Sequence, residues 1–100
     1  MSVFTKRLKE ARKLAGLSQE ALGVAAGLEE ESASTRMNRY EVGARVPDHD
    51  LVERFAAVLN VPAPFFYTSD DEVAWLLVTY HRMRPVERKK VIEAVRGMVS

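Results

Sequence analysis

Thr35, Asn38 and Arg39 are the residues whose types and spacing point most directly to a chemical role. A helix turns by about 100° per residue, so these three side chains would share one face of a helix near residues 33–41. Hydroxyl, amide and guanidinium groups form hydrogen bonds with base edges and with phosphate oxygens. We therefore interpret this outer face as a surface that contacts nucleic acid.

The opposite side of the same helix carries Ala33, Met37 and Tyr40, which suit packing against other helices. The acidic residues at 29–31 stand before this helix, where carboxylates favour the positive end of its dipole. We expect no acidic residue on the outer face. All groups on that face would then be able to donate hydrogen bonds to nucleic acid.

Apolar residues that recur every three or four positions predict further helices that must position this one. Serine, threonine or aspartate stands at the predicted helix starts, and glycine or asparagine at several predicted ends. The predicted helices cover about 4–15, 18–26, 48–60, 70–81 and 85–99. The expected N-caps are Ser2 or Thr5, Ser18, Ser32 or Ser34, Asp48 or Asp50, and Ser69 or Asp70, with Phe65, Phe66 and Tyr67 covering the bundle.

The length of 100 residues suffices for one helical core without support from metals or disulfides. The formal net charge is +1, so the total charge does not indicate a nucleic-acid partner. Basic residues instead gather in the first helix, around the helix near 33–41, and towards the C-terminal end. Acidic residues gather at 29–31 and 70–72. The distribution of charge is therefore more informative than its sum.

Several functional classes are disfavoured by the composition. The chain has no cysteine, which excludes disulfides and thiolate metal sites and suits a reducing cytoplasm. His49 and His81 lie far apart in the sequence, so we expect neither a metal nor another cofactor. The N-terminal segment lacks a secretory signal, and no apolar run is long enough to span a membrane. Without a nucleophile–base pairing or a glycine-rich phosphate loop, we do not expect an enzyme.

Two segments of the chain resemble the Cro/C1-type, or Xre-type, helix-turn-helix domain of phage repressors and bacterial regulators. They are RLKEARKLAGLSQEALGVAAGL and RMNRYEVGARVPDHDLVERFAAVLNVPAPFFY, so the resemblance covers about residues 4–67. The motifs SQ…L…G, YExG and LNVP…F occur in the family's order, which makes the signal specific. The resemblance implies an all-α, lambda-repressor-like bundle of about five helices, here followed by two C-terminal helices, in a sequence-specific regulator of transcription, most simply a repressor.

The resemblance also implies roles for individual residues. What looks like the family's base-reading surface falls on Ser34, Thr35 and Arg39, flanked by Arg36 and Asn38. Residues expected to contact phosphate are Gln19, which matches a glutamine at the start of the family's second helix, and also Ser18 and Arg45. Both routes, helical geometry and resemblance, thus select Thr35 and Arg39.

Arg12 matches an arginine that pairs, in the family, with a glutamate at the end of the recognition helix, which here is Glu41. Such a pair would connect the first helix to the end of the recognition helix and fix the angle of the recognition helix. The chain departs from the family pattern at Gly23, where alanine is usual and where a close helix crossing would explain the glycine. It is also about one helical turn longer than usual between Gly27 and Glu41, through the insertion at 29–32.

We expect two domains, a helix-turn-helix domain over 1–67 and a dimerising helical extension over 68–100. The helix over 70–81 is apolar on two sides, so one side is left to recruit a partner. The expected homodimer interface is Val73, Trp75, Leu76, Val78, Tyr80 and Val95. A homodimer would bind double-stranded DNA with a palindromic operator. The alternative is a protein-interaction module, such as an antitoxin whose C-terminal helices bind a toxin.

Overall fold

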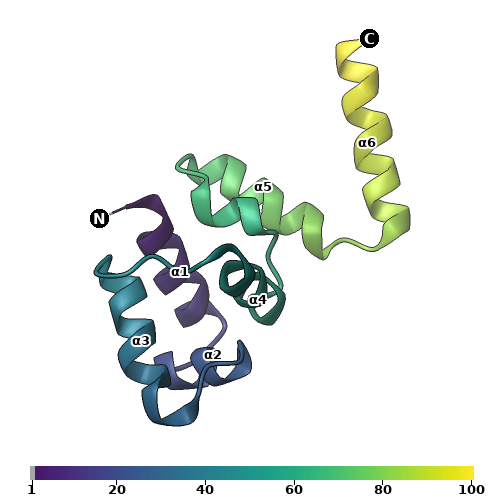
Figure 1. Ribbon diagram of the computed structural model, residues 1–100. Helices are drawn as coiled ribbons and strands as arrows, with labels where there is room; N and C mark the ends of the chain where they lie inside the picture. The colour runs from purple at the N-terminus through teal and green to yellow at the C-terminus, as the bar shows by residue number, and fades with distance from the viewer. Residues whose placement is uncertain (1) are drawn as a thin grey trace.

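The chain is all-helical across residues 2–100, the part that the computed structural model describes (Figure 1). The bundle begins with four α-helices and a 3₁₀ helix and continues with two α-helices. These are α1 (Val3–Leu14), α2 (Gln19–Ala25), α3 (Glu30–Val42), α4 (His49–Leu59), η1 (Ala63–Tyr67), α5 (Asp71–Arg82) and α6 (Pro85–Val99). The expected fold class, five helical segments and two C-terminal helices, is confirmed.

Side-chain caps fix most of the helix starts. The oxygens of Ser2, Ser18, Asp48 and Asp70 each accept a backbone N–H from the first turn of the helix that follows. These caps satisfy donors that have no partner inside the helix. Between the paired candidates, the structure selects Ser2, Asp48 and Asp70 rather than Thr5, Asp50 and Ser69.

The start of α3 differs from the prediction. The helix begins at Glu30 with Glu29 as its N-cap, and the Glu29 side chain makes no capping hydrogen bond. Caps at Ser32 or Ser34 were therefore wrong, and most of segment 29–32 is the first turn of the helix rather than an insertion before it. Carboxylates near the positive end of a helix dipole stabilise this start without a serine cap.

The hydrophobic core lies among α1 to α4 and η1. Ala33, Met37 and Tyr40 are buried, as the period of α3 predicted, and they pack with residues such as Leu22 and Phe55. The expected aromatic cover is only partly correct. Phe65 and Phe66 are buried, but the Tyr67 side chain is exposed.

The α2–α3 crossing is close, and Gly23 makes it possible. A β-carbon at Gly23 would lie 3.0 Å from Ala33 Cβ and 3.0 Å from Met37 Cγ. Both distances are shorter than ordinary van der Waals contact between carbon atoms. The glycine is therefore explained by the approach of α3, the element that carries the candidate site.

The C-terminal helices contribute little to the core, and only α6 leaves the bundle. In α5 only Ala74 is buried, and α6 has no buried residue. Figure 1 shows α6 projecting away from the other helices, at the far end of the molecule from α3. The radius of gyration of 15.3 Å accordingly exceeds the roughly 13 Å expected of a compact chain of this length.

Three arginines are used to close helix ends. Arg54 donates to a main-chain carbonyl at the end of α2, and Arg82 to carbonyls at the end of α4. Arg88 donates to carbonyls in the last turn of α5 and lies over a tyrosine ring of that helix. These cations satisfy carbonyls that lack helical partners. This packing disfavours a phosphate contact by Arg88.

Candidate nucleic-acid interface

The outer face of α3 is solvent-exposed along its length. Ser34, Thr35, Asn38 and Arg39 are all exposed, whereas the opposite side of the helix is buried. The helix lies on the outside of the bundle, where nothing else in residues 2–100 covers that face (Figure 1). These four side chains can therefore reach a groove of DNA without a rearrangement of the fold.

The outer face also carries an acidic residue that was not expected there. Because α3 begins at Glu30, Glu31 is helical and lies four residues before Thr35 and seven before Asn38. At about 100° per residue, these spacings place all three on one face. The expectation that this face has no acid was wrong, because it rested on the wrong start of the helix.

A bidentate ion pair joins the end of α3 to α1. Arg12 Nε lies 2.6 Å from Glu41 Oε2 and Arg12 Nη2 lies 3.0 Å from Glu41 Oε1, while Arg12 Nη1 donates to the Leu17 carbonyl at 2.9 Å. Both side chains are almost fully buried, with exposed fractions of 11% for Arg12 and 2% for Glu41. The hydrogen bond to Glu41 raises the pKa of the Arg12 guanidinium, against the opposing effect of burial. The pair expected from the sequence is thus formed.

Gln19 extends this pair to the surface of α3. Its Nε2 donates to Glu41 Oε1 at 3.2 Å and to Asn38 Oδ1 at 3.3 Å. Because the Asn38 oxygen accepts this bond, the Asn38 amide nitrogen is left to donate outward. The structure therefore places Gln19 as a residue that orients Asn38, a role that the sequence did not predict.

The remaining predicted site residues lie around this face. Arg36 is exposed on the side of α3, and its Nη2 donates to the Tyr40 hydroxyl at 3.0 Å. Ser18 caps α2 by accepting the Ala21 N–H at 3.0 Å, which leaves its own hydroxyl hydrogen for a second partner. Arg45 is exposed in the segment after α3. These residues flank the outer face rather than extend it.

Comparison with known proteins agrees with this arrangement. A family model described as a helix-turn-helix domain matches residues 4–64. The chain belongs to this helix-turn-helix family. Among solved structures, that of transcriptional regulator BswR matches with a TM-score of 0.87 and 37% identity, over 97% of this chain and 94% of that chain. A comparison with curated proteins gave no match. The resemblance to helix-turn-helix DNA-binding regulators is therefore confirmed.

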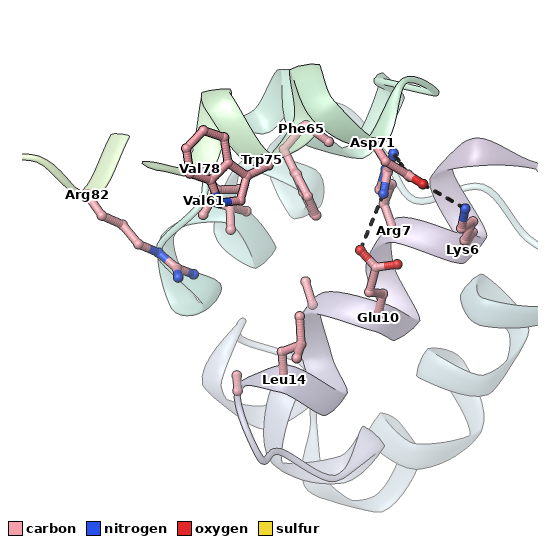
Figure 2. Close-up of a pocket in the computed structure, with 13 residues that line it drawn as sticks. Lys6, Arg7, Glu10, Leu14, Val61, Phe65, Asp71, Trp75, Val78 and Arg82 are labelled. Atoms are coloured by element: carbon pink, nitrogen blue, oxygen red, sulfur yellow. Dashed lines mark hydrogen bonds and ion pairs between the residues drawn. The ribbon is translucent and has the colours of Figure 1, made fainter. Parts of the chain in front are cut away.

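The helix-turn-helix match ends before α5, and a groove lies where α5 meets α1. The groove has a volume of about 550 Å³, and Figure 2 shows Leu14 of α1 facing Trp75 and Val78 of α5 across it. Leu14 and Trp75 are 83% and 64% exposed. The groove is therefore an open apolar surface beside the helix-turn-helix domain.

Arg7 ties α5 to the helix-turn-helix domain at one end of this groove. Its guanidinium donates to the carbonyls of Thr68 and Ser69 and to Asp71 Oδ1, the last at 2.9 Å. The hydrogen bond from Arg7, together with the nearby charge of Lys6, lowers the pKa of Asp71. Arg7 is one of the basic residues of the first helix, and its spacing there does not predict partners at Thr68, Ser69 and Asp71.

Two further properties concern residues 2–100. No group of three or more histidine, cysteine or acidic side chains is arranged to hold a metal ion in this part of the chain. None of its helices combines the length and apolarity that crossing a membrane requires.

Proposed function

We propose that this protein is a sequence-specific, double-stranded DNA-binding regulator of transcription that inserts α3 into the major groove. The observation that carries the proposal is the exposed outer face of α3, with Ser34, Thr35, Asn38 and Arg39 held at a fixed angle by a buried ion pair. The 37% identity with transcriptional regulator BswR over nearly the whole chain supports a regulatory role. We further propose that the protein acts in the cytoplasm, without catalytic activity.

The proposed base contacts follow from the donor groups of this face. Arg39 can donate two parallel hydrogen bonds to O6 and N7 of guanine, a contact worth about 1–3 kcal/mol of discrimination. Asn38, oriented by Gln19, donates its amide nitrogen to an acceptor on a base edge. Ser34 and Thr35 stand at the N-terminal half of the face, where hydroxyls can bond to either kind of base edge.

The proposed phosphate contacts come from the residues that flank α3. Ser18 is exposed at the start of α2 and Arg45 in the segment after α3, while Arg36 stands beside the outer face rather than on it. Such contacts fix the register of a protein on DNA without reading its sequence. Gln19 was expected to join them, but its amide hydrogens point to Glu41 and Asn38, so we propose that it acts mainly by orienting Asn38.

We propose a homodimer formed by residues 68–100, with 1–67 as the DNA-binding domain. The expected interface side chains Val73, Trp75, Leu76 and Val95 are exposed, and Val78 and Tyr80 are half-buried. An isolated helix of about this length is marginal in water, so α6 gains stability only when its apolar side is covered. Two copies would present two α3 helices to half-sites about 34 Å apart, which predicts a palindromic operator. A dimer bound to this operator would exclude other proteins from the DNA, so we propose that the protein acts as a repressor.

The test is to compare Arg39→Ala with the wild type on an operator selected from random DNA and on unselected DNA, at stated salt. Arg96→Ala is the matched control, because Arg96 is exposed on α6 and its loss changes the charge equally. Arg39→Ala should weaken operator binding by roughly 5- to 150-fold and unselected binding much less. Equal losses on both kinds of DNA would contradict base reading by Arg39.

A second candidate function is a protein-interaction module, such as an antitoxin. The observation that favours it is the exposed apolar side of α6, which has no partner within residues 2–100. A small toxin encoded beside this chain, which forms a stable complex with the wild type and not with Val95→Asp, would support this function. It is compatible with DNA binding, because the two surfaces lie at opposite ends of the molecule (Figure 1).

A further inference from the structure

The first turn of α3 extends the outer face beyond the residues assigned to it above. Glu31 is exposed, helical, and shares its face with Thr35 and Asn38. We propose that Glu31 is a specificity-determining residue that selects cytosine in the operator. The inference rests on the proposed function, since it requires α3 to lie in the major groove.

The spacing along the helix sets where Glu31 would act. Thr35 lies four positions after Glu31, which corresponds to about 6 Å along a helix that rises about 1.5 Å per residue. Base pairs in B-DNA are about 3.4 Å apart. Glu31 therefore faces a base about two steps away from the one that Thr35 faces.

The chemistry of a carboxylate decides which base it can face. An ionised glutamate only accepts hydrogen bonds, and the donors in the major groove are the amino groups N4 of cytosine and N6 of adenine. In adenine the amino group stands beside N7, an acceptor whose lone pair repels a carboxylate. In cytosine no acceptor on the same base competes. Guanine and thymine present acceptors at this edge and are disfavoured.

The Glu31 carboxylate is available for this contact. Within residues 2–100 the ion pairs involve other acids, and Glu31 takes part in none of them. Its negative charge also repels phosphates, so a position of the first turn of α3 next to the DNA backbone is unfavourable. A position where a base amino group faces the carboxylate remains favourable. The same charge would select against unspecific binding.

If Glu31 only stabilised the start of α3, Glu30 would serve the same purpose. Glu30 and Glu31 both lie in the first turn of α3, where carboxylates favour the helix dipole. Glu30 is exposed as well, but at about 100° per residue it lies on the side of α3 that also carries Met37. Glu30 lies four residues before Ser34, so among the outer-face residues it neighbours Ser34 and not Thr35 or Asn38. Glu30→Gln removes the same charge from the same turn and leaves Glu31 in place, which makes it the matched control.

The experiment selects bound sequences from a random DNA pool with the wild type, Glu31→Gln and Glu30→Gln, at one stated salt concentration. The wild type and Glu30→Gln should share a motif with a conserved cytosine. Glu31→Gln should lose that preference roughly tenfold and turn towards adenine, because glutamine can bond to N6 and N7 together. The affinity for unselected DNA should increase by the same factor in both variants, since each loses one negative charge.

Titrations with a second set of DNAs complete the test. Replacing the selected cytosine by thymine should weaken wild-type binding roughly tenfold and leave Glu31→Gln unaffected. The proposal is overturned if Glu31→Gln selects the wild-type motif unchanged, or if Glu30→Gln alters it equally. If the wild type itself selects no motif, the proposed function fails instead, so the two failures are distinguishable. Melting curves of the two variants should match each other, because each loses one exposed carboxylate from the first turn of α3.

Discussion

Replacing Arg12 with alanine should strongly destabilise the fold. The substitution leaves the Glu41 carboxylate, which is only 2% exposed, without its cation and with Gln19 as its remaining donor. Removing one partner of a buried ion pair costs about 3–5 kcal/mol, a large share of the roughly 5–15 kcal/mol by which small domains are stable. Because 1 kcal/mol corresponds to about 4–8 °C in a domain of this size, the melting temperature should fall by about 12 °C or more.

The assay is urea and thermal unfolding followed by circular dichroism. Arg96→Ala is the control, since it removes an exposed arginine and should change stability little. The double variant Arg12→Met/Glu41→Met replaces both charges with apolar side chains of similar length, and it should be more stable than Arg12→Ala. A melting temperature of Arg12→Ala within about 2 °C of the wild type would refute this reasoning.

The same variant separates stability from base reading. Arg12 is buried in α1 against Glu41 and lies off the outer face of α3, so Arg12→Ala should weaken binding to all sequences and leave base preference unchanged. Binding measured well below the melting temperature of the variant reports this directly. A change at one base position alone would contradict the role of the pair in fixing the angle of α3.

Three further predictions concern the supporting structure. Gly23→Ala should lower the melting temperature. Overpacking against Ala33 costs about 1–3 kcal/mol of folding free energy, which outweighs the gain of about 1 kcal/mol in helix propensity. Adding Ala33→Gly should restore part of the lost stability. Because Arg7 holds the pKa of Asp71 below its ordinary 3.8, the carboxylate stabilises the fold above about pH 4 and loses this effect as the pH falls through the lowered pKa. Asp71→Asn should therefore be less stable than the wild type at neutral pH and converge with it in acid, which unfolding at several pH values would measure. Val95→Asp should shift the protein from dimer to monomer in sedimentation without lowering helix content, and a monomeric wild type at micromolar concentration would contradict the dimer.

The sequence predicted the helices well wherever local signals decide their ends. Serine and aspartate caps mark α1, α2, α4 and α5, and Gly43 and Asn60 take the left-handed conformation that closes α3 and α4. The start of α3 could not be predicted in this way. Glu29 provides no side-chain cap. Predicting the start therefore required comparing the stabilisation of the helix dipole by several carboxylates with capping by Ser32 or Ser34, and residue spacing does not determine which is larger.

The candidate site was predictable as a face but not as a set of contacts. The spacing of the apolar residues in α3 identified its buried side, and the side chains that point outward are those on the opposite side of the same helix. The amide of Gln19 and the guanidinium of Arg7 instead have partners far along the chain, the latter at Thr68 and beyond. Such contacts depend on how helices cross, which sequence periodicity does not specify.

Chemical-shift mapping of the labelled protein with a duplex selected from random DNA tests most directly that α3 is the DNA-reading element. The largest changes should fall on the outer face of α3, at Glu31, Ser34, Thr35, Asn38 and Arg39, with small changes in α6. Changes concentrated in α5 and α6, with the α3 signals unmoved, would contradict insertion of α3 into the major groove.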